Sequence, residues 1–170
     1  MLKLLKKALE ELPDLMKDPE QWTSLDIDCS PKTRRVWTVW NNNKIMLERF
    51  GPCGPGEARY RPNPGPSATV IMRGQCEVGI GFSSEARDEA PIISRTLAGG
   101  GECFEMPASD TWHYIRPTQE TFAITVMGTA WGCGPEFKEN FSPLDEETKE
   151  DVIFTFSYHL ERWPIRIPNI

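Results

Sequence analysis

Pairs of cysteines at short spacing, long apolar runs and an excess of positive charge are all missing from this sequence. Its five cysteines are an odd number, they are widely spaced, and no two of them form a Cys-x-x-Cys pair. This pattern argues against a disulfide framework and against a structural zinc site. It is typical of a protein kept in a reducing cytosol, and we therefore expect a cytoplasmic location.

The missing apolar runs and the missing basic excess each exclude a class of partner. The longest apolar runs, such as residues 122–127, fall far short of the ~20 residues that cross a bilayer, and charged residues interrupt the N-terminal leucines, which excludes a signal peptide. The formal charge of −6 works against nucleic-acid binding, because neutralising phosphates requires a basic surface. We expect neither a membrane nor a nucleic acid as partner.

What remains is the composition of a soluble globular domain. Charged residues make up 26% of the chain and hydrophobic residues 39%, which is usual for this class. A length of 170 residues is enough for one domain with its own core.

Both ends of the chain have helical patterns. Residues 2–12 predict an amphipathic helix that ends near Pro13, and Asp18-Pro19 predicts a short second helix. Near the C-terminus, Ser142 and Pro143 provide start signals for a further helix. The apolar stripe of the first helix consists of leucines at helical spacing: Leu2, Leu5, Leu9 and Leu12. This stripe needs a surface to cover it, either on its own domain or on a dimer partner.

The middle of the chain has strand patterns instead. A hairpin is predicted around the turn Asn41-Asn42-Asn43 and a second one around Gly74, with Gly79 and Gly81 marking a bend in the return strand. A further strand–turn–strand unit is predicted around Pro107. The predicted strands span residues 36–40, 45–50, 68–72, 75–82, 92–97, 102–106, 112–116 and 122–127. Short strands at this spacing predict an antiparallel sandwich or barrel.

His113 opens the strand that follows Pro107. Alternation places His113 and Ile115 on one face and Trp112, Tyr114 and Arg116 on the other. Because its face also carries an apolar residue, we expect His113 to point into the interior.

The residues from Gly101 through Pro107 to His113 resemble the second conserved motif of the cupins, which are small double-stranded β-helix (jelly-roll) barrels. The segment 59–68 is similar to the first motif of small cupins, with Arg61 and Asn63 in place of its two histidines. The resemblance covers about residues 35–130. It implies an all-β cupin barrel over residues 35–131, a helical lead-in over 1–34 and a helical C-terminal extension over 132–170 packed on the same domain.

The departures from the motif bear on the metal that cupins bind. A guanidinium has no lone pair to offer, so Arg61 cannot be a ligand, and Asn63 offers only a weak carbonyl oxygen. His113 alone cannot hold a transition metal usefully, and no cofactor is therefore expected. If a metal site exists, it would use His113, Glu105 and Asn63 for iron, manganese or zinc.

Three functions stay open on this basis. The first is a metal-free cupin that binds a small polar or anionic ligand through Arg61, Asn63 and His113, with Arg59 and Trp112 at the barrel mouth. The second is a metal-dependent cupin enzyme, an oxygenase or isomerase. The third is a structural or oligomerisation module without a ligand, in which the barrel presents surfaces. Without a ligand, Arg59 and Arg61 would pair with Glu57 or Glu105 at the rim. Because cupins commonly pair through edge strands, a homodimer is also predicted.

Overall fold

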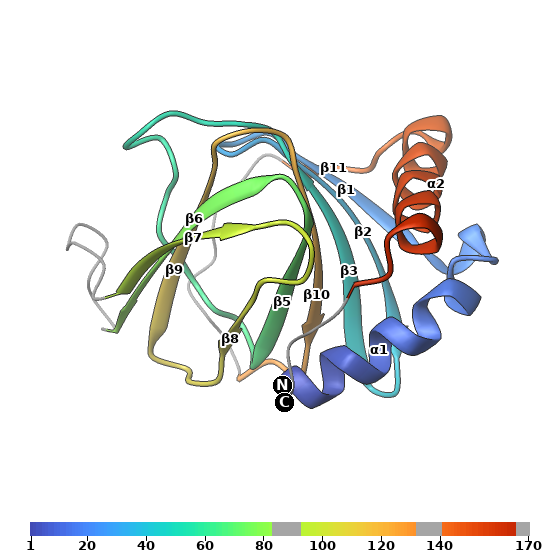
Figure 1. Cartoon of the computed structure of the whole chain (residues 1–170), viewed down its shortest axis with the longest axis horizontal. Coiled ribbons are helices and arrows are strands. Elements are labelled where there is room, and N and C mark those ends of the chain that lie inside the picture. Colours follow the sequence, from blue (N-terminus) through green and yellow to red (C-terminus); the bar gives the residue numbers. More distant parts are fainter. Residues whose placement is uncertain (83–92, 132–140, 166–170) are drawn as a thin grey trace.

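Two antiparallel β-sheets face each other and form a barrel, as the computed structural model shows (Figure 1). The structure describes residues 1–82, 93–131 and 141–165. The larger sheet has the order β11-β1-β2-β3-β10-β5-β8, and the smaller has the order β4-β9-β6-β7. The strands of the larger sheet are β11 (Phe141–Ser142), β1 (Thr23–Ile27), β2 (Thr33–Trp40), β3 (Asn43–Phe50), β10 (Thr121–Met127), β5 (Ser67–Arg73) and β8 (Cys103–Met106). Those of the smaller sheet are β4 (Arg61–Pro62), β9 (Thr111–Pro117), β6 (Gln75–Phe82) and β7 (Ile93–Ala98).

The chain crosses from one sheet to the other at two places where the sequence predicts a simple hairpin. β5 and β6 belong to different sheets, and so do β8 and β9. At the first crossing Gly74 has φ +92°, and a Cβ there would lie 2.5 Å from the Glu120 carbonyl oxygen. Only glycine fits this turn. The two hairpin predictions are therefore wrong, whereas the predicted jelly-roll barrel with a helix at each end is confirmed.

The hairpin β2–β3 is confirmed. Asn41 and Asn42 have φ +47° and +60°, which is the geometry of a two-residue turn that matches the twist of the strands. This turn fixes the register, so that Arg35 lies opposite Glu48.

The predicted helices are present, with shifted ends. α1 (Leu2–Leu15) continues past Pro13, because Leu12 and Met16, which are buried in the core, hold its last turn against the sheet. The second helix is a short 3-10 turn, η1 (Pro19–Gln21). α2 (Glu146–Arg162) is capped by Asp145, whose Oδ1 accepts a hydrogen bond from the Thr148 N–H at 2.7 Å, while Ser142 lies in β11. None of these helices is long and apolar enough to span a membrane.

One strand was missed. β1 lies within the segment predicted as a helical lead-in, and it pairs with β2 along its whole length. Its short sequence Thr-Ser-Leu-Asp-Ile has too few apolar residues to show strand alternation, and its pairing with β2 is a tertiary contact. Of the predicted C-terminal extension, residues 132–140 and 166–170 lie outside the described residues.

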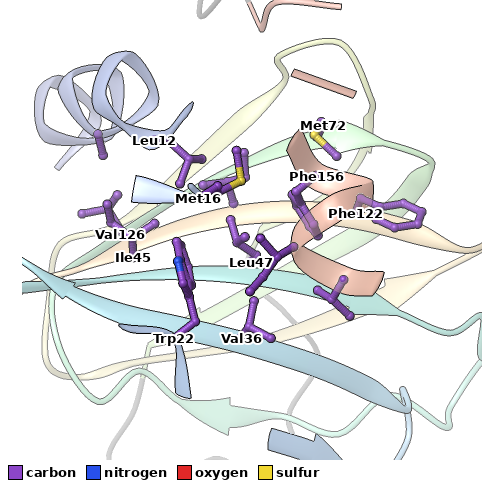
Figure 2. Packing of buried hydrophobic residues seen from close by; sticks show 14 of the residues in the cluster. Leu12, Met16, Trp22, Val36, Ile45, Leu47, Met72, Phe122, Val126 and Phe156 are labelled. Atoms are coloured by element: carbon purple, nitrogen blue, oxygen red, sulfur yellow. The ribbon is translucent and has the colours of Figure 1, made fainter. Parts of the chain in front are cut away.

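The central strands of the larger sheet, β3, β10 and β5, are buried on both faces. The outer face of this sheet packs against α1 and α2, as Figure 2 shows for Leu12, Leu47 and Phe156. Its inner face joins the smaller sheet around a second apolar cluster, which includes Ile71, Val78 and Met106. The helices therefore provide a core outside the barrel, and part of the barrel interior is free for a polar site.

Candidate functional site

A cavity of about 390 Å³ lies between the two sheets. Cavities of this size accommodate small molecules. Its apolar wall includes Pro31, Met46, Phe50, Phe104, Ile115 and Met127. Its polar wall includes Arg35, Glu48, Arg59, Arg61, Asn63, Ser67, Thr69, His113, Tyr114 and Thr125. The ligand that fits such walls has both an apolar body and polar groups.

A row of hydrogen-bonded side chains, which we call the polar ladder, crosses the inner face of the larger sheet. Arg35 donates to Glu48 Oε1 from Nε at 2.9 Å and from Nη2 at 2.7 Å. Thr125 Oγ1 donates to Glu48 Oε2 at 2.8 Å, and Thr69 Oγ1 lies 2.8 Å from Thr125 Oγ1. The register explains the row, because Arg35 is opposite Glu48 and Thr69 is opposite Thr125. Both oxygens of the buried Glu48 carboxylate are thus hydrogen-bonded, and Arg35 forms an ion pair with it.

His113 lies on the opposite wall, on β9, and points inward as predicted. The pKa of His113 is lowered to about 4, mainly by burial and also by the positive charges of Arg61 and Arg35, while Glu48 acts in the opposite direction. The imidazole is therefore neutral at pH 7. Its Nδ1 atom is buried without a hydrogen-bond partner among the described residues, and leaving such an atom unpaired costs about 1–3 kcal/mol.

The two arginines of the first motif both line this cavity. Arg61 lies directly opposite His113 in the β4–β9 pair, and its Nη2 donates to Cys29 Sγ at 2.6 Å. Arg59 precedes β4 and is exposed. Among the described lining residues, three arginines face a single carboxylate, that of Glu48. The described part of the lining therefore carries more cationic than anionic side chains.

Asn63 is mainly a structural residue. Its Nδ2 donates to the Met106 carbonyl oxygen at 3.2 Å, and its Oδ1 accepts from Ser67 Oγ at 3.3 Å. Both ends of the amide are thus paired with the protein. Trp112, predicted at the barrel mouth, is 6% exposed and does not line this cavity.

Tyr114 follows His113 in β9, and alternation directs its side chain to the other face of the strand. Its ring lies over Gly79, where a Cβ would come within 2.1 Å of Tyr114 Cε1. Its hydroxyl donates to Glu77, and Tyr60 packs edge-on against it with ring centroids 5.1 Å apart. Gly79 therefore makes room for a tyrosine ring.

The donor set does not fit the metal of the cupin motif. His113 is the one imidazole of the cavity, and the amide of Asn63 is already paired. Glu105 does not line the cavity and pairs with the amino group of Met1. In the part of the chain that the structure describes, no three His, Cys, Asp or Glu side chains come close enough together to hold a metal ion. The three predicted ligands are not brought together, because Glu105 lies outside the cavity lining.

Four of the predicted site residues line the cavity, namely Arg59, Arg61, Asn63 and His113. The polar ladder was not predicted. One signal for it was present, because a two-residue turn at Asn41-Asn42 places Arg35 opposite Glu48. Nothing in the local sequence places Thr69 next to Thr125, since their contact joins strands 56 residues apart.

The fold is similar to solved structures of one enzyme. The chain matches hydroxypropylphosphonic acid epoxidase from S. wedmorenis with a TM-score of 0.52 and 12% identity, over 65% of this chain and 56% of that one. It matches the iron(II) form, FeII HppE, with a TM-score of 0.53 and 13% identity, over 65% of this chain and 57% of that one. The chain thus spans little more than half the length of these cupin-fold proteins, and at this identity the likeness shows the fold alone.

No protein-family model matches the sequence, and no curated protein matches it. The architecture is a cupin-type jelly roll.

Proposed function

We propose that this protein binds a small anionic molecule in its barrel without a metal. The observation that carries the proposal is the charge of the cavity, where Arg35, Arg59 and Arg61 face the single carboxylate of Glu48 among the described lining residues. Glu48 pairs with Arg35, and Arg59 and Arg61 are the other two cationic side chains of the described lining.

The anionic group of the ligand would lie against the wall formed by β4 and β9. Arg61 supplies charge there, and the neighbouring His113 supplies a neutral ring that can donate or accept a hydrogen bond. The apolar residues of the cavity, such as Met46 and Phe104, would hold the ligand's body. A small carboxylic, phosphonic or phosphoric acid with a short carbon skeleton has this shape and charge.

Thermal unfolding in the presence of small acids tests the proposal. At about ten times the dissociation constant, a bound ligand adds about 1.4 kcal/mol and raises the Tm by about 3–6 °C in a domain of this size. Butyrate, methylphosphonate and inorganic phosphate are suitable probes, with glycerol as a neutral comparison. We expect the acids, but not glycerol, to raise the Tm.

Two controls make the test specific. Arg61→Ala should abolish the rise in Tm that the acids cause. Arg162→Ala, on the exposed face of α2, removes the same charge outside the cavity and should leave this rise in Tm intact. Iron(II), manganese(II) and zinc(II) should give no comparable stabilisation. A stoichiometric metal in the purified protein that is lost in His113→Ala would overturn the proposal in favour of the metal-dependent enzyme.

A further inference from the structure

A second cavity, of about 630 Å³, lies outside the barrel near the C-terminal end of α2. We call it the aromatic pocket, and its described lining consists of Met72, Arg73, Gly100, Tyr158, His159 and Trp163. Met72 belongs to the apolar core between the larger sheet and the helices, so the pocket lies on the outer side of this sheet. None of its described lining residues lines the barrel cavity. The two cavities can therefore be filled independently.

One wall of the aromatic pocket consists of rings. Tyr158 and His159 lie near the end of α2, and Trp163 follows four residues after His159, which brings the two rings together. The ring centroids of His159 and Trp163 are 5.3 Å apart, and those of Tyr158 and Trp163 are 6.4 Å apart. Trp163 is nevertheless 58% exposed and Tyr158 42% exposed. Ring surface that is open to water beside a cavity favours a ligand that covers it.

Arg73 is the one charged side chain of the described lining. A guanidinium has only hydrogen-bond donors, so its Nη1 donates to His159 Nε2 at 3.1 Å. The guanidinium also lies 5.8 Å from the centre of the Phe122 ring. Burial and the charge of Arg73 lower the pKa of His159, so the imidazole is neutral at pH 7 and does not balance the arginine.

Arg73 forms no ion pair in the part of the chain that the structure describes. The nearby Arg49 pairs instead with Glu120 at 2.7 Å and with Asp151 at 3.3 Å. Arg73 thus keeps most of its N–H groups for a ligand, while two rings hold its guanidinium at the edge of the pocket. A guanidinium held in this way can bind an acid group through two parallel hydrogen bonds.

We propose that the aromatic pocket binds a planar aromatic acid, whose ring packs against Trp163 and whose acid group pairs with Arg73. The rings of the wall supply apolar contact, and the arginine supplies the one charge, so the occupant that matches both is a ring system with a negative group. A saturated body of the same size is not flat and covers the rings less closely. This site does not depend on the proposed function of the barrel cavity.

Calorimetric titration with four probes of similar size tests the class of ligand. The probes are 2-naphthoate, its uncharged amide 2-naphthamide, the saturated acid decahydro-2-naphthoate and the cation 2-naphthylmethylammonium. We expect 2-naphthoate to bind about tenfold more tightly than the amide, which brings no negative charge to Arg73. The saturated acid should bind about fivefold more weakly than 2-naphthoate, because it cannot stack. The cation should bind most weakly, because Arg73 repels it.

Two substitutions of exposed side chains, each with a matched control, locate the site. Arg73→Gln removes the charge, and the preference for the acid over the amide should fall to within about twofold. Trp163→Leu removes the ring face, and the preference for the flat acid over the saturated one should fall to within about twofold as well. Arg59→Gln at the barrel cavity and Trp131→Leu, at another exposed tryptophan, should leave both preferences intact.

NMR locates the ligand without altering the pocket. The protein has two histidines, and 2-naphthoate should shift the imidazole resonances of His159 but not those of His113. If Arg73→Gln or Trp163→Leu does not fold, this measurement and the comparison of the four probes in the unaltered protein decide between the outcomes.

The assignment is overturned if the amide, the saturated acid or the cation binds as tightly as 2-naphthoate, or if no probe binds at millimolar concentration. Binding that is weakened by Arg59→Gln but not by Arg73→Gln would place the acid in the barrel and contradict the assignment. Binding that requires removal of residues 166–170 would mean that the chain itself occupies the pocket, which also overturns it. None of these results decides whether the barrel cavity binds small anions.

Discussion

At the scale of single residues, His113 is expected to make the stability of the protein depend on pH. Its pKa is about 4 in the folded protein and about 6.5 in an unfolded chain. Unfolding therefore takes up a proton between these two values, and the contribution of His113 to stability is complete above pH 6.5. It falls as the pH drops toward 4, by roughly 2–3 kcal/mol in total.

This expectation can be measured by urea unfolding at pH 7 and pH 4. Because carboxylates also titrate in this range, the variant His113→Phe serves as the comparison. Between pH 7 and pH 4 its free energy of unfolding should fall by about 2–3 kcal/mol less than that of the unaltered protein. In His159→Gln the one remaining imidazole should show no titration by NMR between pH 8 and pH 5. An imidazole resonance that titrates near pH 6.5 would contradict the burial of His113.

Residue patterns in the sequence predicted some parts of the site and not others. Alternation around His113 was enough to point it inward, because a strand has only two faces. The partners that give the cavity its chemistry were less accessible to such reasoning. Thr69 and Thr125 meet through strand pairing across the sheet, and no local rule specifies which distant strands become neighbours.

At the scale of elements, strand β6 contains a matched pair of glycines. A Cβ at Gly79 would lie 2.1 Å from Tyr114 Cε1, whereas a Cβ at Gly81 meets nothing within 4 Å. Tyr114 cannot move aside freely, because it is held by Glu77 and Tyr60. We therefore expect Gly79→Ala to destabilise the protein by about 1–3 kcal/mol.

Gly81→Ala is the control for this substitution and should be neutral or stabilising by up to about 1 kcal/mol, since alanine reduces the entropy of the unfolded chain. Denaturant unfolding of both variants gives the comparison. In a Tyr114→Ala background, Gly79→Ala should no longer destabilise. Equal effects of the two glycine substitutions would show that the ring does not press on β6.

The elements themselves differed in how well the sequence predicted them. The β2–β3 hairpin followed from its turn residues, because asparagine tolerates the left-handed backbone that the turn needs. The passages from one sheet to the other at Gly74 and after Pro107 did not follow from their turn residues. A turn signal does not reveal whether the next strand continues in the same sheet. The overall class was nevertheless recovered, because short alternating strands determine it regardless of their partners.

At the scale of the whole molecule, α1 covers the outer face of the larger sheet. Its predicted apolar stripe finds its partner within the same chain, where Leu5 and Leu12 are fully buried. The stripe therefore gives no reason to expect a second copy. The homodimer stays a prediction that now depends on the edge strands alone.

Removing side-chain volume from this interface should weaken the entire fold. Leu12→Ala is expected to cost about 3 kcal/mol, because it leaves a space between α1 and the sheet. Lys6→Ala, on the exposed face of the same helix, should change stability by less than about 0.5 kcal/mol. Chemical denaturation measures both variants. A Leu12→Ala effect as small as that of Lys6→Ala would mean that the helix is dispensable for the barrel.

The position of β10 at the centre of the larger sheet has a consequence for how the chain is made. β10 pairs with β3 and β5, yet it is the last of the long strands to leave the ribosome, 71 residues after the end of β3. Until then the edges of β3 and β5 have no neighbour on this side, and such edges favour pairing with other chains. Folding must also close this long loop, which makes it slow. Synthesis, rather than the finished barrel, is thus the stage at which this protein is most exposed to aggregation.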